Sequence, residues 1–313
     1  MRTKVKDYRA GDEVNNLILR LVNVQYRKTT SQADYVNALG FDGEEILEVK
    51  IWNVTDSIRE NLENGKIYTC SGQMKDYQGK LQFNLKELAE ADPSLYRLEE
   101  FFEYAKLSVE ELKEKIMNYV LKIENANIKK LVLAVLKEDL DAYFVHPAAK
   151  SVHHNYISGL AYHVYSMLKL ADTYIELYPF LNKDLIYGGI LLHDFGKITE
   201  MEKTTGEYTK QGNLLGHIII ASNILYEKAK ELSLEESEEY LMLAHIIIAH
   251  HGFLEFGSPK EPTIPEAYVV FLCDYADSRM GALEKELKDG VKGEYSQPVF
   301  AFNKRIFYLP DLD

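Results

Sequence analysis

The sequence predicts a two-domain chain, in which a small all-β barrel is followed by an all-α helical bundle. Over residues 13–90, apolar side chains alternate with polar ones, as they do in antiparallel strands with one buried face. From Pro93 onward the apolar residues recur at helical spacing, and strand signals return only at 295–309. We therefore assign residues 1–92 to the β domain and residues 93–313 to the helical domain, with an extended segment at its C-terminal end.

Short apolar runs separated by glycine-containing turns define the β domain. The clearest alternation places Leu47, Val49 and Ile51 against Glu48, Lys50 and Trp52. About five strands in fewer than 100 residues indicate a small barrel, and a short helical stretch at 55–65 makes the order similar to that of an OB-fold. The strands that we expect cover 14–27, 45–54, 66–74 and 80–88.

The helical domain opens on a capping box, in which Ser108 precedes Glu111 by three residues. Further helices are expected over 127–143, 156–177, 184–194, 214–232, 236–250 and 265–288. The sequence shows no internal repeat and no low-complexity segment.

The composition excludes several classes of protein. No run of 18 apolar residues is present, and the basic N-terminus lacks an apolar stretch behind it, so we expect neither a membrane span nor a secretory signal. The two cysteines, Cys70 and Cys273, lie far apart in apolar settings, which is typical of a cytoplasmic protein without a disulfide framework.

The formal net charge of −13 is unevenly distributed. Residues 1–90 contain 13 Lys and Arg side chains against 14 Asp and Glu side chains, so nearly all of the negative charge lies in the remainder. A strongly acidic chain is a poor general binder of nucleic acid. If one part of this chain holds a polyanion, the nearly neutral N-terminal part is the better candidate.

The histidines carry the strongest chemical signal. All nine lie between residues 146 and 251, and several end or interrupt apolar helical stretches. Buried imidazole and carboxylate groups that converge from several helices need a partner, and a divalent metal ion satisfies all of them at once. The candidate ligands are His163, His193, Asp194, His217, His250, His251 and Asp274.

These candidates are more numerous than one ion requires. Two ions bridged by a carboxylate would use them all, and such sites commonly clamp an in-line displacement at phosphorus. The mixture of imidazole and carboxylate suits manganese, iron, cobalt, nickel or zinc better than magnesium in an all-oxygen cage, and manganese is the ion that we expect first.

Motifs around these residues resemble a known family. The stretch HDFGK at 193–197, with His163 before it and Asp274 after it, resembles the HD phosphohydrolase superfamily, and the additional histidines resemble its binuclear members. The wider stretches HHNYISGLAYH (153–163), GNLLGHI (212–218) and HHGFLEFGSPKEPTIPEA (250–267) resemble the YhaM family of 3′–5′ exoribonucleases. That family joins an N-terminal OB-fold to an HD domain over about this length.

The resemblance implies roles for individual residues. His163, His193, Asp194 and Asp274 would hold one ion, and Asp194 would bridge to a second ion held by His217, His250 and His251. Asp194 and Lys197 would be catalytic, with Lys197 facing the phosphate. The sequence departs from the family pattern at Tyr162, where an acidic residue is usual, and at Arg279, where we expected a lysine.

Substrate contacts are expected in both domains. In the helical domain the candidates are His154, Glu255 and Arg279, whereas His146 and His245 are interpreted as structural. In the β domain Trp52 and Tyr77 could stack on bases and Lys80 could follow a backbone, since stacking suits single strands of any sequence. The alternatives are that Trp52 plugs the barrel end and that Lys80, with Gln82, Asn84 and Lys86, forms an ordinary solvated face.

The sequence predicts a metal-dependent 3′–5′ exoribonuclease that hydrolyses single-stranded RNA to nucleoside 5′-monophosphates. Single-stranded DNA is an alternative substrate. One alternative is an HD phosphohydrolase of a nucleotide or cyclic dinucleotide, with the barrel in a regulatory role. Another is a non-catalytic nucleic-acid-binding protein, against which the complete ligand set argues. A homo-oligomer is compatible with each of these, and no membrane partner is expected.

Overall fold

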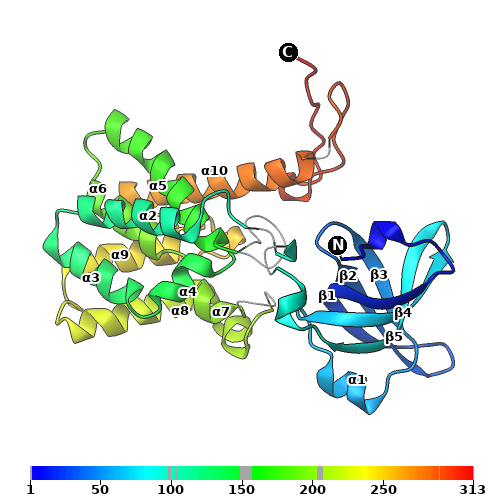
Figure 1. Cartoon of the computed structure of the whole chain (residues 1–313). Helices are drawn as coiled ribbons and strands as arrows, with labels where there is room; N and C mark the ends of the chain where they lie inside the picture. The colour runs from blue at the N-terminus through cyan, green and yellow to red at the C-terminus, as the bar shows by residue number, and fades with distance from the viewer. Residues whose placement is uncertain are drawn as a thin grey trace. The chain divides into compact units, whose positions relative to one another are not determined.

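The computed structural model describes residues 2–97, 100–102, 104–148, 157–202, 207–288 and 290–312. The chain divides into two compact units, Met1–Glu103 and Tyr104–Asp313, each with its own elements (Figure 1). The predicted fold class, an OB-like barrel followed by a helical bundle, is confirmed.

The first unit is a closed five-stranded barrel with the strand order β1-β2-β3-β5-β4. Neighbouring strands are antiparallel except β3 and β5, which pair in parallel and close the barrel. The helix α1 connects β3 to β4, and its N-cap Thr55 accepts a hydrogen bond from the Ile58 amide. The elements are η1 (Val5–Asp7), β1 (Glu13–Lys28), β2 (Asp34–Phe41), β3 (Ile46–Ile51), α1 (Asp56–Asn61), β4 (Ile67–Tyr77), β5 (Lys80–Glu90) and η2 (Pro93–Leu95).

Alternation along each strand builds the barrel core. Leu47, Val49 and Ile51 point inward and are buried, as the sequence predicts, and Leu19 and Phe83 join them from β1 and β5. Because successive side chains of a strand face opposite sides, the intervening polar residues cover the outside of the barrel.

Two details of the barrel differ from the expectation. The sequence of β2 shows few large apolar residues, because its inward positions include Ala38 and Gly40. Glycine is required at position 40, since a Cβ atom there would lie 2.9 Å from the Val49 side chain. Gln82 is buried rather than solvated, since its side-chain amide donates a 2.6 Å hydrogen bond to Glu48.

The second unit is a bundle of helices around one large apolar core. Its first helix begins at the predicted capping box, where the Ser108 hydroxyl accepts from the Glu111 amide and the Glu111 carboxylate accepts from the Ser108 amide. The helices are α2 (Val109–Lys122), α3 (Ala126–Leu136), α4 (Leu140–Val145), α5 (Gly159–Leu177), α6 (Lys183–Leu192), α7 (Lys197–Glu200), α8 (Lys210–Glu231), α9 (Glu238–Ala249) and α10 (Pro265–Leu287).

The predicted single helix over 127–143 is wrong. It breaks after Lys137, and the Asp139 side chain accepts from the Ala142 amide to start α4 as a new helix. The apolar spacing continues across the break, which is why periodicity alone did not reveal it.

Two glycines bring the later helices into place. Gly189 of α6 packs against α9 so closely that a Cβ atom there would lie 2.5 Å from the Ile246 side chain. Gly216 has a φ of 73° and interrupts α8, so that His217 begins a fresh helical segment. Such a φ is accessible to glycine at little cost and is strained in most other residues.

The C-terminal segment after α10 is not the regular strand that its sequence suggested. Among the residues described there, it forms the short helix η5 (Phe300–Phe302) and two isolated bridges, Tyr295 to Tyr308 and Val299 to Arg305. None of the helices in the described part of the chain has the length and apolar character needed to cross a membrane.

Candidate metal centre

The seven predicted ligand residues come together at one place in the helical unit. They are supplied by α5, by the ends of α6 and α9, by α8 and by α10, and most of them are buried. Their positions are His163 on α5, His193 and Asp194 after α6, His217 on α8, His250 and His251 after α9, and Asp274 on α10.

The Asp194 carboxylate lies in the middle of the group. Its Oδ2 atom is 3.3 Å from His193 Nε2 and 3.8 Å from His163 Nε2. Its Oδ1 atom is 3.4 Å from His217 Nε2 and 3.8 Å from His250 Nε2. Each oxygen therefore faces a different pair of imidazoles.

The potential ligand atoms cluster in two main sets. In one, atoms of His163, His193 and Asp274 all lie within 4.8 Å of one another, and in the other the same is true of His217, His250 and His251. A third set of the same size, His193, Asp194 and His250, connects the two. The third set shares His193 with the first and His250 with the second, and Asp194 is its remaining member.

The Nδ1 atom of each imidazole already has an acceptor. His193 and His250 donate to the carbonyl groups of Ile190 and Ile247, at 2.8 and 2.7 Å. His251 donates to the Phe256 carbonyl at 3.0 Å. An acceptor at Nδ1 places the proton there, so the Nε2 lone pair of a neutral ring is free to bind a metal ion.

Four buried polar atoms at this point have no hydrogen-bond partner among the described residues. They are the Nε2 atoms of His193, His217 and His250 and the Oδ1 atom of Asp194. An unsatisfied buried polar group is costly, and four that face one point are what a bound cation would compensate. The donor set, imidazole nitrogen and carboxylate oxygen, fits a divalent transition metal.

Two carboxylates that the sequence analysis did not identify hold the remaining imidazoles. Asp277 lies 2.6 Å from His163 Nδ1, and Glu200 lies 3.0 Å from His217 Nδ1. Glu200 also accepts from the His217 amide at 2.8 Å, at the start of the segment that follows the Gly216 kink. Asp277 could have been found from its spacing, because it lies one helical turn after Asp274.

The surroundings of Asp194 and His250 keep these two groups in the forms that bind metal. Burial raises the pKa of the Asp194 carboxyl, but the charges of Lys197 and His193 outweigh it and hold that pKa well below its usual range. Burial, together with the neighbouring His251, lowers the pKa of His250 well below its usual value. An ionised carboxylate and neutral imidazoles are the forms that ligate metals.

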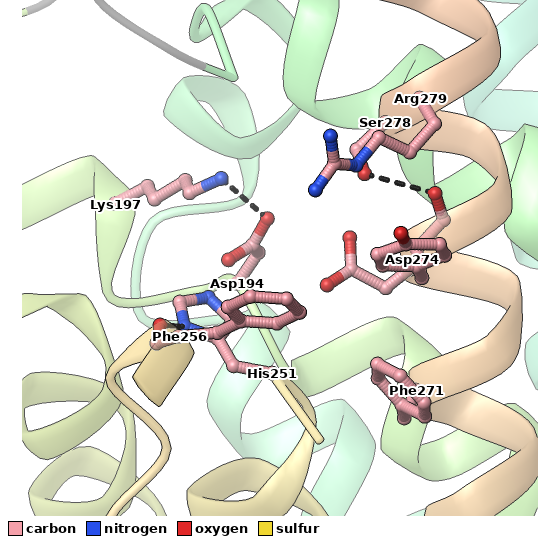
Figure 2. A pocket seen from close by; sticks show the side chains of 9 residues that line it. Asp194, Lys197, His251, Phe256, Phe271, Asp274, Ser278 and Arg279 are labelled. Atoms are coloured by element: carbon pink, nitrogen blue, oxygen red, sulfur yellow. Dashed lines mark hydrogen bonds and ion pairs between the residues drawn. The ribbon is translucent and has the colours of Figure 1, made fainter. Parts of the chain in front are cut away.

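A cavity of about 220 Å³ opens onto this centre, lined by Asp194, Lys197 and Asp274 among others. Figure 2 shows the Lys197 ammonium reaching Asp194, at 2.7 Å from its Oδ2 atom, and the Arg279 guanidinium extending from α10 toward the same space. The two cations give the cavity wall the character of an anion site beside the acidic centre.

The other predicted substrate residues of the helical unit have different outcomes. Glu255 is exposed in η4 (Leu254–Phe256) and does not line the cavity. His154 lies outside the described residues. The two histidines interpreted as structural contact backbone: both ring nitrogens of His146 meet carbonyl oxygens, and His245 Nε2 accepts from the Thr263 amide.

The barrel candidates lie on its outer surface. Trp52 is 51% exposed, stacks on Tyr35 with ring centroids 5.1 Å apart, and donates from Nε1 to Asn84. The idea that Trp52 plugs the barrel is therefore wrong. Tyr77 and Lys80 pair at the end of the β4–β5 hairpin and line a surface hollow of about 530 Å³.

Similar solved structures add little. One is the Ifi202 HINa domain with 20 bp of duplex DNA, which is 18% identical, covers 33% of this chain and 57% of its own, and has a TM-score of 0.22. Another, described as a molecular basis for abrogation of pro-inflammatory cytokine activation, is 19% identical, covers 36% of this chain and 63% of its own, and has the same TM-score. At such scores the likeness carries no argument.

The sequence comparisons are decisive for the family. The HD domain model matches residues 160–279, which include all seven predicted ligand residues. The 3′–5′ exoribonuclease YhaM of Listeria innocua serovar 6a is 34% identical over 316 aligned residues, covering 100% of both chains. As its motifs predicted, the chain belongs to the YhaM family of 3′–5′ exoribonucleases.

Proposed function

We propose that this protein is a metal-dependent 3′–5′ exoribonuclease that removes nucleoside 5′-monophosphates from single-stranded RNA, using two divalent ions in the helical unit. The single observation that carries the proposal is the convergence of unpartnered Nε2 atoms on both oxygens of Asp194. The full-length similarity to the Listeria enzyme supports the reaction class.

In this proposal His163, His193 and Asp274 hold one ion, while His217, His250 and His251 hold the other. Asp194, whose Oδ2 faces the first set and whose Oδ1 faces the second, would be shared by both ions. Divalent ions bound there would supply Lewis acidity toward the phosphodiester and would lower the pKa of a bound water molecule. Manganese is the ion that we expect.

The chain's own residues would position the substrate. Lys197 is half-buried and lies 2.7 Å from Asp194, so a phosphate at the centre would come within reach of its ammonium group. Arg279 lines the cavity from α10 and would contact the same phosphate or its neighbour. A preorganised cation such as Lys197 stabilises charge that develops in the transition state.

The barrel would guide the single strand. Trp52 and Tyr77 expose aromatic faces, and Lys80 supplies a cation next to Tyr77. Stacking on such faces tolerates any sequence, which suits an enzyme that degrades a strand step by step.

The experiment is digestion of single-stranded RNA labelled at its 5′ end, after chelator treatment and stepwise return of Mn²⁺. We expect a ladder that shortens by one nucleotide at a time and nucleoside 5′-monophosphate as the released product. Internal fragments, or activity that survives chelation, would contradict the proposal.

One observation favours a second candidate, a phosphohydrolase of a small nucleotide. The cavity at the centre, about 220 Å³, is closer in size to a pocket for one small ligand, roughly 300–1,000 Å³, than to a groove for a long strand. The two candidates separate in a competition assay, because a small-nucleotide enzyme would turn over a cyclic dinucleotide faster than RNA.

A further inference from the structure

Four side chains from three segments of the helical unit form a stack beside the proposed metal centre. The rings of Phe256 in η4 and Tyr275 in α10 are nearly parallel, at 9°, with centroids 6.3 Å apart. The guanidinium carbon of Arg279 lies 4.9 Å from the Tyr275 ring centroid and 5.5 Å from that of Phe302 in η5. The stack thus runs from Phe256 through Tyr275 and Arg279 to Phe302.

Three members of this stack line the cavity that contains Asp194 and Asp274. Phe256 is 43% exposed and Tyr275 is 41% exposed, so neither ring serves only as core. Exposed aromatic faces beside a polar centre are typical of a ligand site, because the base of a nucleotide presents a flat π-face for stacking.

Arg279 is held in place without being neutralised. Within the described residues no carboxylate forms an ion pair with it and no acceptor takes a hydrogen bond from it, although it lies between two rings at cation–π distance. A guanidinium at cation–π distance from two rings can still donate from its planar array of N–H groups, which suits a phosphate.

The stack is connected to the proposed metal ligands. The Phe256 carbonyl accepts from His251 Nδ1, so the loop that presents the Phe256 ring also orients an imidazole of the centre. Gly257, with a φ of 88°, ends this turn. At the other end, Phe302 lies beyond residues 160–279 that match the HD domain, so the C-terminal segment contributes to the site.

Building on the proposed function, we propose that this stack receives the 3′-terminal nucleotide of the substrate. Phe256 and Tyr275 carry its base, Arg279 binds its phosphate, and Phe302 is a positioning residue for Arg279. The scissile phosphate must reach Asp194 and Asp274, and the terminal nucleotide is then confined to the same cavity.

The first test compares two single-stranded RNAs that differ only in the last nucleotide, which either carries a base or is abasic. Stacking is worth roughly 1–3 kcal/mol per base, so the wild type should cleave the RNA with the terminal base about fivefold faster or more in kcat/KM. The variants Phe256→Leu and Tyr275→Leu should reduce this preference. Phe180→Leu, which alters a ring that is 73% exposed elsewhere in the unit, should leave it unchanged.

The second test isolates the positioning role of Phe302. Phe302→Leu should raise KM for RNA by about twofold to tenfold, the range of a lost cation–π contact, with kcat nearly unchanged. In an Arg279→Ala background the same substitution should have no further effect. Phe300→Leu, at an 80% exposed ring two residues away, is the matched control.

Binding of adenosine 5′-monophosphate to the metal-free protein, measured by calorimetry, provides a readout independent of turnover. Loss of the Phe256 and Tyr275 rings should weaken this binding and leave inorganic phosphate binding unchanged, whereas Arg279→Ala should weaken both.

Equal cleavage of the two RNAs by an active wild type would overturn this inference and leave the exoribonuclease proposal standing. An additive loss in the Phe302 and Arg279 double variant would also overturn the positioning role. A wild type that does not degrade RNA at all would instead contradict the proposed function itself.

Discussion

The barrel and the helical unit differ in how their polar side chains are hydrogen-bonded. In the barrel, the exposed Trp52 indole donates to Asn84 and the buried Gln82 amide donates to Glu48. In the helical unit, four buried polar atoms without a hydrogen-bond partner lie around Asp194. Unpartnered buried atoms occur in the barrel too, at Arg2 and Asn37, but they do not converge with metal-ligating side chains.

The two units differ in how far their polar groups are satisfied without a ligand. The barrel satisfies its outer polar groups internally or in water, so its surface can change partners at little cost. The helical unit holds an arrangement that is costly until a cation compensates it, as buried charges require. This difference supports the proposal that the chemistry takes place in the helical unit and that the barrel guides the strand.

The largest effect is expected from Asp194→Asn. An amide keeps the shape but is a poor bridging ligand for two cations, so turnover should fall at least a hundredfold, on the order of 3 kcal/mol in the activation barrier. RNA affinity, measured with Ca²⁺ in place of Mn²⁺, should change far less. Asp141→Asn, at an exposed position of α4, is the matched control. Near wild-type cleavage by Asp194→Asn would remove the centre from the chemistry.

The next effect separates the two metal sites. Glu200→Gln should weaken the site that contains His217, and Asp277→Asn should weaken the site that contains His163, because each carboxylate holds the Nδ1 atom of that ligand. Removing a carboxylate that hydrogen-bonds a metal-binding histidine typically lowers metal affinity by about 10- to 100-fold. Calorimetric metal titration should show one transition weakened and the other retained. If both variants weakened the same transition, the division into two sites would be wrong.

A smaller effect tests the barrel. Trp52→Ala should reduce affinity for long single strands by roughly 1–3 kcal/mol, the worth of one stacked base, and should leave hydrolysis of a dinucleotide unchanged. Leu95→Ala removes another exposed apolar side chain of the same unit and should have no effect on either measurement. Equal loss of both activities would show that the barrel is needed to build the active site.

The smallest effect concerns His245 and the pH dependence of stability. Burial, and to a lesser extent Lys260, lowers the pKa of His245, whose Nε2 accepts from the Thr263 amide. A depressed folded-state pKa contributes stability above the unfolded-state value of about 6.5, and this stability is lost as pH falls through the folded-state pKa. The thermal midpoint of His245→Gln should therefore depend less on pH between about 7 and 5 than that of the wild type. An unchanged pH dependence would contradict this role.

The parts of the fold that follow from local pattern were predictable from sequence. Leu47, Val49 and Ile51 alternate with polar residues because one face of β3 lies in the core. Ser108 and Glu111 form a capping box that indicates the start of α2. The break between α3 and α4 was missed, because it depends on the single cap at Asp139 while the apolar spacing continues. The strand β2 was missed, because Gly40 has no side chain to signal burial.

The types of the candidate ligand residues and their order along the chain could be predicted from the sequence. His193 and Asp194 are conspicuous, because ionisable groups follow an apolar run directly. The roles of Glu200 and Phe302 were not, because they depend on the kink at Gly216 and on the course of the C-terminal segment. Contacts of this kind arise from tertiary packing and leave no periodic signal in the chain.

The most direct test of the binuclear centre is titration of Mn²⁺ into chelator-stripped protein, followed by calorimetry and by elemental analysis after desalting. We predict two equivalents per chain for the wild type. A stoichiometry of one or less under saturating Mn²⁺ would contradict the bridging role of Asp194 and the mechanism that depends on it.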